Sequence, residues 1–265
     1  MRSRFPRHPW IGLTALFLAA ALGACRPEPP PQGEEVESGG WDFYLNNEKI
    51  GSETYVLRRS GRQLQCTVRS ELPGALASAS VRMRLSASYR PLEFELEAQR
   101  SPLGRMEIRA DLEPGRARVR MTRGELVRED TVEISARARL LEEGLVTLAQ
   151  LALQGLDLRQ RERFELPVLL PQLFTQAQIQ VENLGLEKIA VGDEPPRPLR
   201  HVRLSLAGGA SDYWLDDDRR VRRYVSQVPG GLLEARRQPA AARKRSSAAR
   251  PPTGIDSPSP TSSAS

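Results

Sequence analysis

The chain has 265 residues, of which 39% are hydrophobic and 5% aromatic, and its 39 Lys and Arg against 33 Asp and Glu give a formal net charge of +6. The excess positive charge lies at the two ends, because residues 1–24 hold three arginines and no acid, and residues 236–265 hold six cations and one acid. The intervening chain is nearly neutral. This argues against a nucleic-acid-binding domain, which needs a basic face on its folded part.

The N-terminal segment has the three-part pattern of a secretory signal peptide. Arg2, Arg4 and Arg7 are followed by an apolar run over residues 11–22 and then by small residues. The apolar run is shorter than the stretch of about 20 residues that a membrane-spanning helix needs. We therefore predict that residues 1–24 are a signal peptide that is removed on export.

This segment ends in Leu22, Gly23, Ala24 and Cys25, which resembles the lipobox of bacterial lipoproteins. The resemblance implies that Cys25 is acylated and becomes the first residue of the mature chain. Acyl chains anchor a protein to a membrane because each buried methylene contributes about 0.8 kcal/mol. Arg26, rather than Asp, follows the cysteine, which in lipoproteins implies the outer membrane, with the chain facing the periplasm. The alternative is an ordinary secreted protein with a chance cysteine.

Two segments that offer little to bury flank a predicted β-rich domain over residues 41–235. Residues 25–40 contain many Pro, Glu and Gly residues and predict a tether that is stiff at the prolines and loose at Gly39 and Gly40. Residues 236–265 form a basic tail rich in Pro, Ser and Ala, which we expect to be disordered. The tail would either contact anionic lipid or simply keep the chain soluble.

Cys66 has no partner for an intramolecular disulfide if Cys25 carries lipid. It alternates with Leu64 and Val68 on the apolar side of a predicted strand, which predicts a buried and inert thiol. A reactive thiol would need a cationic, accessible setting with a histidine nearby, and no such setting is evident in the sequence.

Alternation of apolar and charged residues dominates the predicted domain. Four successive segments place apolar side chains on one face and charged side chains on the other: residues 81–89, 92–98, 105–112 and 116–121. Turn residues separate the later segments, including Glu113-Pro114-Gly115. The pattern predicts an antiparallel meander with one buried face and one solvated face carrying cross-strand charge pairs.

Residues 41–72 and 177–235 repeat this alternation, for a total of about ten strands. Residues 135–158 are the exception, because Leu141, Leu145, Leu148 and Ala152 recur there at helical spacing. We predict a helix in this segment, with Ser135 as its cap and Gly155 at its end. Its apolar stripe must pack against the concave face of the sheet.

The order of several segments is similar to that of a broad, uncharacterised family of periplasmic β-proteins: "GSETYVL", "YRPLEFEL", "VENLGLEKIAVG" and "DYWLDDDRRVRRY". More distantly, the chain resembles the lipoprotein carrier and lipoprotein receptor proteins of the outer-membrane sorting pathway. The resemblance implies a mainly β fold in which a single, strongly curved antiparallel sheet, an incomplete barrel, wraps one apolar α-helix. The carriers use the cavity of this fold for acyl chains.

His201 is the one histidine outside the predicted signal peptide. It falls on the polar side of a strand, opposite Val202 and Leu204, so we expect it to face solvent. No nucleophile or orienting acid stands out as a partner, and zinc-type ligand spacing is absent. The sequence therefore predicts no catalytic residue and no cofactor.

The acidic run at residues 216–218 is a weak metal candidate, with Asp216 and Asp218 as the suspected ligands. A calcium loop needs six to eight shaped oxygen ligands, and neither a loop glycine nor a distal glutamate follows the usual spacing. The preferred interpretation is a hairpin turn, because aspartate side chains bond readily to nearby backbone N–H groups.

Two functions follow, and neither is enzymatic. The first is an outer-membrane lipoprotein that binds an acyl-bearing or other apolar ligand in the concave face of its sheet. The second is a structural or adaptor lipoprotein with a closed core, which binds an envelope protein through its outer sheet face or its tail. The sequence names no ligand-binding residues that distinguish them.

Overall fold

The computed structural model describes residues 33–72, 78–100, 104–158, 162–206 and 209–239. These residues form one 15-stranded sheet, one α-helix and one short 3-10 helix. The strands are β1 (Glu34–Leu45), β2 (Glu48–Ser60), β3 (Gln63–Glu71), β4 (Ser78–Ser86), β5 (Pro91–Arg100), β6 (Gly104–Glu113), β7 (Arg116–Arg123), β8 (Leu126–Glu133), β9 (Arg139–Leu140), β10 (Arg163–Leu170), β11 (Thr175–Ile189), β12 (Arg197–Leu206), β13 (Gly209–Leu215), β14 (Val221–Val228) and β15 (Gly231–Arg237). The helices are α1 (Val146–Gln154) and η1 (Pro171–Leu173).

The sheet is a long meander that joins its own two ends at β1 and β15. Its order is β8-β7-β6-β5-β4-β3-β2-β1-β15-β14-β13-β12-β11-β10-β9, so that sequence neighbours pair almost throughout. All pairs are antiparallel except β9 with β10, which is parallel. No pairing joins β8 to β9 among the described residues, and the sheet is therefore open, as an incomplete barrel is.

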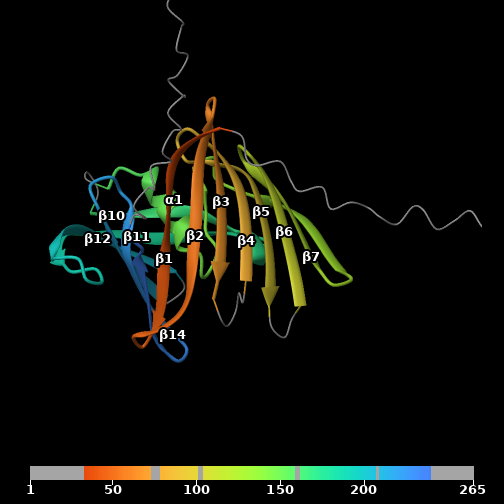
Figure 1. Ribbon diagram of the computed structural model, residues 1–265. Helices are drawn as coiled ribbons and strands as arrows, with labels where there is room; N and C mark the ends of the chain where they lie inside the picture. The colour runs from red at the N-terminus through yellow and green to blue at the C-terminus, as the bar shows by residue number, and fades with distance from the viewer. Residues whose placement is uncertain (1–32, 73–77, 101–103, 159–161, 207–208, 240–265) are drawn as a thin grey trace, which may run out of the picture. The chain divides into compact units, whose positions relative to one another are not determined.

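The sheet is strongly curved and wraps α1, which Figure 1 shows behind β1 and β2. The guanidinium of Arg128 on β8 lies 4.0 Å from the ring centroid of Phe174, next to β11, so distant parts of the sheet meet. One apolar core takes residues from both halves of the sheet and from the helix, among them Phe43, Ile108, Leu148 and Val168. The predicted fold class is thereby confirmed.

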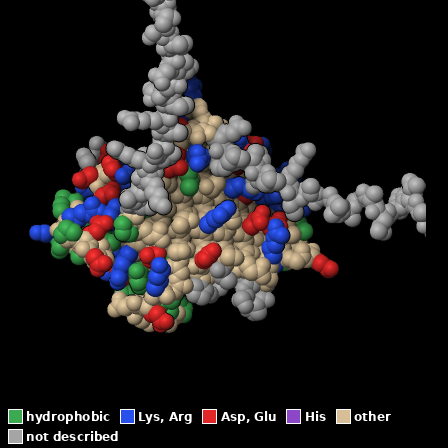
Figure 2. All heavy atoms as spheres, viewed as in Figure 1, with side chains coloured by type: hydrophobic (Ala, Val, Ile, Leu, Met, Phe, Trp, Pro, Cys, Tyr) green, Lys and Arg blue, Asp and Glu red, His purple; other side chains and the backbone are tan. Residues whose placement is uncertain are grey.

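The alternating segments behave as predicted. On β4, Ala79, Val81, Met83 and Leu85 are buried, and the intervening side chains face outward. The outer face carries cross-strand ion pairs, including Arg82 with Glu95 at 2.9 Å and Arg105 with Glu97 at 3.1 Å. Figure 2 shows basic and acidic side chains interspersed on this side of the molecule. Such exposed pairs contribute little to stability and mainly give each strand a charged outer face.

The structure has more strands than the alternation predicts. β8 is exposed along nearly its whole length and has Arg128 and Asp130 on the side that faces the core elsewhere in the sheet. A strand without an apolar side leaves no period-two signal. β8 ends the sheet, and inward-facing charges at an edge also discourage pairing with another strand.

The folded region begins earlier and ends later than the sequence predicts. β1 starts at Glu34, inside the predicted tether, and β15 continues to Arg237, inside the predicted tail. Gly39 and Gly40 are ladder residues with close neighbours, since a Cβ on Gly40 would lie 2.6 Å from the carbonyl oxygen of Glu53. These glycines permit close backbone approach, whereas composition alone suggested flexibility.

The helix is shorter than predicted. It starts at Val146, and Ser135 is not its cap, because residues 135–145 form turns and the short strand β9. Gly144 has a φ of 81°, which a helix cannot contain. Gly155 caps the C-terminal end, as predicted. No described helix has the length and hydropathy to cross a bilayer.

Candidate functional site

The concave face of the sheet is filled by α1. Every residue from Val146 to Leu153 is buried. A gap between the helix and β4, near Met83 and Leu148, has a volume of about 10 Å³. That is room for about one water molecule, whereas pockets for small ligands measure roughly 300–1,000 Å³.

A buried carboxylate fixes the N-terminal end of this helix. Glu53 on β2 has no exposed surface. Its side chain accepts hydrogen bonds from the backbone N–H groups of Val146 (3.2 Å) and Thr147 (2.8 Å) and from the Thr147 hydroxyl (2.5 Å). Burial raises the pKa of Glu53 to about 7, although the hydrogen bonds from Thr147 and Val146 act in the opposite direction. α1 lacks a local side-chain cap, and Glu53 supplies one from the sheet.

An arginine fixes the C-terminal end. Arg219, in the turn between β13 and β14, donates hydrogen bonds to the carbonyl oxygens of Gln154 (3.1 Å) and Leu156 (2.7 Å). The helix macrodipole favours an anion at its first turn and a cation at its last. Arg219 meets the second preference, and an ionised Glu53 would meet the first. The hydrogen bonds of Glu53 and Arg219 hold the two ends of α1.

A third contact ties the middle of the helix to both ends of the folded region. Gln150 donates to Glu37 on β1 (3.2 Å) and accepts from Arg237 on β15 (3.0 Å). Tyr55 on β2 donates to Glu37 and accepts from Arg237 (2.6 Å). The Glu37 and Arg237 side chains are 10% and 7% exposed, so this ion pair is largely removed from water. A polar network therefore joins α1 to the sheet in addition to the apolar packing.

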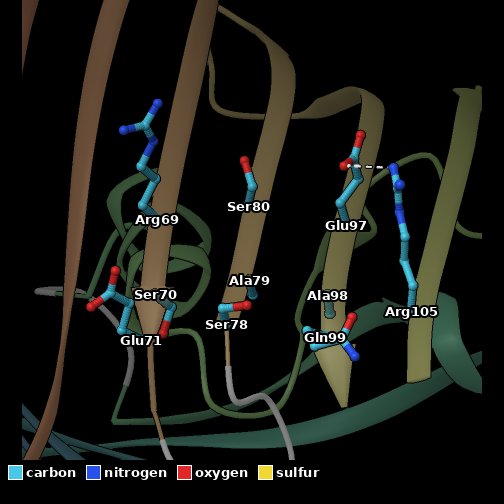
Figure 3. A pocket seen from close by; sticks show the side chains of 10 residues that line it. All are labelled: Arg69, Ser70, Glu71, Ser78, Ala79, Ser80, Glu97, Ala98, Gln99 and Arg105. Carbon is cyan, nitrogen blue, oxygen red and sulfur yellow. Dashed lines mark hydrogen bonds and ion pairs between the residues drawn. The ribbon is translucent and has the colours of Figure 1, made fainter. Parts of the chain in front are cut away.

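The outer face carries a hollow of about 320 Å³ over β3, β4 and β5 (Figure 3). Its floor is formed by Ser78 and Ser80 on β4, whose side chains are short. In register with Ser80 stand Arg69 on β3 and Glu97 on β5. A row of long side chains on each side of short ones leaves a trough that runs along β4.

The charged side chains on the two sides of this hollow differ in whether they form ion pairs. Arg105 forms ion pairs with Glu97 (3.1 Å) and Glu107 (2.9 Å), and the first of these is drawn in Figure 3. Arg69 and Glu71 are exposed, and neither makes an ion pair or a side-chain hydrogen bond within the described part of the chain. The hollow therefore offers Arg69, Glu71, the hydroxyls of Ser78 and Ser80, and the Gln99 amide to a polar ligand.

The suspected metal ligands form a turn. The Asp216 carboxylate accepts from the backbone N–H groups of Asp218 (3.1 Å) and Arg220 (2.9 Å), and Asp218 pairs with the Arg220 guanidinium at 3.0 Å. Their oxygens are thus engaged by the hairpin itself, as the turn interpretation predicts. In the ranges that the structure describes, no group of three or more His, Cys, Asp and Glu residues is arranged to hold a metal ion.

His201 departs from its prediction. Its side chain is only 16% exposed and stacks on Trp214, with ring centroids 4.5 Å apart. Two acids flank the ring: Asp212 lies 2.8 Å from Nε2 and Glu187 lies 3.2 Å from Nδ1. The expectations of a solvent-facing ring without an orienting acid are therefore wrong. Asp212 also binds Arg203, and the hydrogen bonds from Arg203 and His201 outweigh burial and lower the pKa of Asp212.

The His201 cluster still lacks the parts of a nucleophilic centre. The side chains that it contacts through these interactions are an indole and two carboxylates, and none is a nucleophile of the Ser, Cys or Lys type. Cys66 lies elsewhere in the core, where it is buried and free, as predicted. Burial raises the pKa of its thiol, which makes it inert.

Glu53 was not predicted from the sequence, although a signal exists: it shares the apolar side of its strand with Tyr55 and Leu57. An acid on the buried side of an alternating strand is unusual and needs hydrogen-bond donors. The predicted lipidation site, Cys25, and the lipobox residues Leu22, Gly23 and Ala24 lie outside the described residues.

Comparisons with known proteins add a fold likeness. No family model matches the sequence, and no curated protein does. A solved β-barrel-like protein of the domain of unknown function DUF1849, from Brucella abortus, aligns with a TM-score of 0.49 and 10% identity over 76% of this chain and 94% of that one. A DUF1089 family protein from Pseudomonas aeruginosa aligns with a TM-score of 0.35 and 12% identity over 67% of this chain and 89% of that one.

Proposed function

We propose that this chain is a lipid-anchored, periplasm-facing lipoprotein of the outer membrane that binds an envelope protein through the outer face of its sheet and catalyses no reaction. The observation that carries the binding role is the occupied concave face, which α1 fills and where Glu53 and Arg219 hold it. The surface left for a partner is the outer face, with its hollow of about 320 Å³. The membrane anchor is supported by the sequence of residues 22–26 alone.

The chemistry of the hollow favours a polar partner. Arg69 and Glu71 are two residues apart on one strand and face the same side, so they stand roughly 7 Å apart along β3. Ser78 and Ser80 can each donate or accept a hydrogen bond. A segment of a protein surface that carries both charge signs would match these groups, and an apolar chain would leave them without partners.

A crosslinking experiment tests the proposed surface. A photo-crosslinking amino acid is placed at Ser80 in cells that produce the lipidated chain, with Thr131 on β8 as a matched exposed position away from the hollow. We expect a discrete protein adduct from position 80 and none from position 131. A second pair of strains carries the probe at Ser78. Ser80→Arg fills the trough and should remove the adduct from this probe, whereas Thr131→Arg should leave it unchanged. Equal labelling from both probe positions would contradict the proposal.

A ligand titration separates this role from acyl binding in the concave face. The full chain, purified in detergent, is titrated with a fluorescent fatty acid and examined by native mass spectrometry. A closed core predicts no saturable binding and no co-purified acyl chain. Saturable binding that survives Ser80→Arg would favour the acyl-binding role and count against the closed core.

A further inference from the structure

The contact between Glu53 and the N-terminal end of α1 combines three features. Glu53 is completely buried, it contacts the helix through three hydrogen bonds, and it joins strand β2 to α1 on the concave face. This feature lies outside the proposed partner surface and does not depend on it.

Among the residues that the structure describes, Glu53 is surrounded by hydrogen-bond donors and has no basic ion-pair partner. Its cross-strand neighbours are Trp41 on β1 and Ser70 on β3, neither of which is charged. Ionisable groups that interact with it electrostatically include Cys66 on β3, Tyr213 on β13 and Tyr224 on β14, and the pKa of each is raised, away from neutrality. Within the described residues, no Lys, Arg or His forms an ion pair or a hydrogen bond with Glu53.

A buried carboxylate without a cation is costly when it is ionised, even with three donors and a helix dipole beside it. We propose that Glu53 and the first turn of α1 form a pH-dependent latch, which holds the helix on the concave face more firmly at acidic pH than at neutral pH. The other acids that could give such a pH dependence are Glu142 and Glu143, which precede the helix, and Glu37 on β1, which accepts hydrogen bonds from Gln150 and Gln154 of α1.

The direction of the effect follows from the two states of the latch. In the seated state the pKa of Glu53 is raised from 4.5 to about 7, and in an opened state, where the carboxylate is hydrated, it returns towards its ordinary value. Between pH 4.5 and about pH 7, the opened state therefore binds fewer protons than the state in which Glu53 contacts the helix. Its population rises by up to tenfold for each pH unit over this window, on the order of a hundredfold in total, and then levels off above it.

Hydrogen exchange on the full chain measures the latch directly. Exchange rates of α1 amides, corrected for intrinsic pH dependence, are compared at about pH 5 and about pH 7.5, with peptides of β3 and β4 as internal references. We expect the protection factors of residues 146–154 to fall by on the order of a hundredfold at the higher pH, with a much smaller change in the references. Equal changes in all peptides, or none in α1, would overturn the latch.

Variants assign the effect to Glu53. In Glu53→Gln, the protection factors of the α1 amides should be the same at the two pH values. Glu142→Gln and Glu143→Gln, the latter at an exposed position, should retain the difference in protection. If Glu53→Gln does not fold, Thr147→Val serves instead. This variant removes the hydroxyl that stabilises the ionised form, so the midpoint of the exchange transition should move to higher pH. A midpoint that is unchanged in Thr147→Val, or a difference that disappears in Glu142→Gln, would contradict the assignment.

Discussion

At the scale of single residues, Arg219 shows how one side chain joins two elements that are distant in the sequence. It has a φ of 61°, a conformation that costs a non-glycine residue about 1–2 kcal/mol. It also binds two carbonyl oxygens at the end of α1. The backbone strain is tolerated because the turn places the guanidinium where the helix dipole favours a cation.

Substitution of Arg219 separates these two effects. Arg219→Ala should lower the free energy of unfolding by about 1 kcal/mol, since it removes the C-terminal contact and keeps the strained backbone. Arg219→Gly should lower it less, because glycine adopts positive φ without strain. Urea denaturation of both variants measures the difference. If Arg219→Gly lowered the free energy of unfolding more than Arg219→Ala, relief of backbone strain would not offset the greater flexibility of glycine in the unfolded chain.

Cys66 offers a second test at this scale. Its side chain is 1% exposed, and burial raises the pKa of its thiol, so the reactive thiolate is scarce in the folded state. An aqueous thiol reagent should label it only at the rate of global unfolding. Labelling followed by mass spectrometry, with and without urea, checks this. Rapid labelling in native buffer would mean that the region between β2 and β4 opens locally.

At the scale of elements, the junction of β1 and β15 depends on glycines that leave room for neighbouring groups. A Cβ on Gly40 would lie 2.6 Å from the Glu53 carbonyl oxygen and 2.8 Å from Oε1 of Gln238. Gly40→Ala should therefore destabilise the fold by about 1–3 kcal/mol through overpacking. Gly209→Ala, where the nearest atom lies 3.6 Å away, is the matched control and should have less effect. Thermal unfolding of both variants measures this, and equal losses would contradict the argument.

The first half of β1 explains why element boundaries were less predictable than element types. Segments with one apolar and one charged face, such as β4 and β6, could be read from the sequence because alternation reports burial on one side of a sheet. Glu34–Gly40 could not, because its Glu, Ser and Gly residues resemble a linker in composition. Its place in the sheet comes from pairing with β2, a long-range contact that composition does not encode.

At the scale of the whole molecule, the buried pair of Glu37 and Arg237 connects the start and the end of the folded region with α1. A fragment over residues 41–235 lacks both side chains, whereas a fragment over 33–239 retains them. We expect the shorter fragment to unfold at a lower temperature by roughly 10 °C, because lost packing and network contacts amount to several kcal/mol. Circular dichroism during heating compares the two. Equal midpoints would show that the network is peripheral to stability.

The membrane anchor is also a property of the whole chain. If Cys25 carries lipid, Cys25→Ala should move the protein from the membrane fraction to the soluble periplasmic fraction, because acyl chains supply most of the binding free energy. Fractionation and immunoblotting measure this, with Cys66→Ala as the matched control. Membrane retention of the Cys25→Ala variant would contradict the lipobox resemblance.

The sequence by itself determined some local properties of this protein: that the alternating segments are strands, which of their faces are apolar, where α1 ends, and that Cys66 lies in the core. These follow from period-two and helical spacing, which report burial over a few neighbouring residues. Only the tertiary structure decided that α1 fills the concave face, that Glu53 and Arg219 fix its two ends, and that His201 lies between two acids. Each of these facts joins residues from different strands, and their proximity depends on sheet curvature and register, which no local pattern specifies.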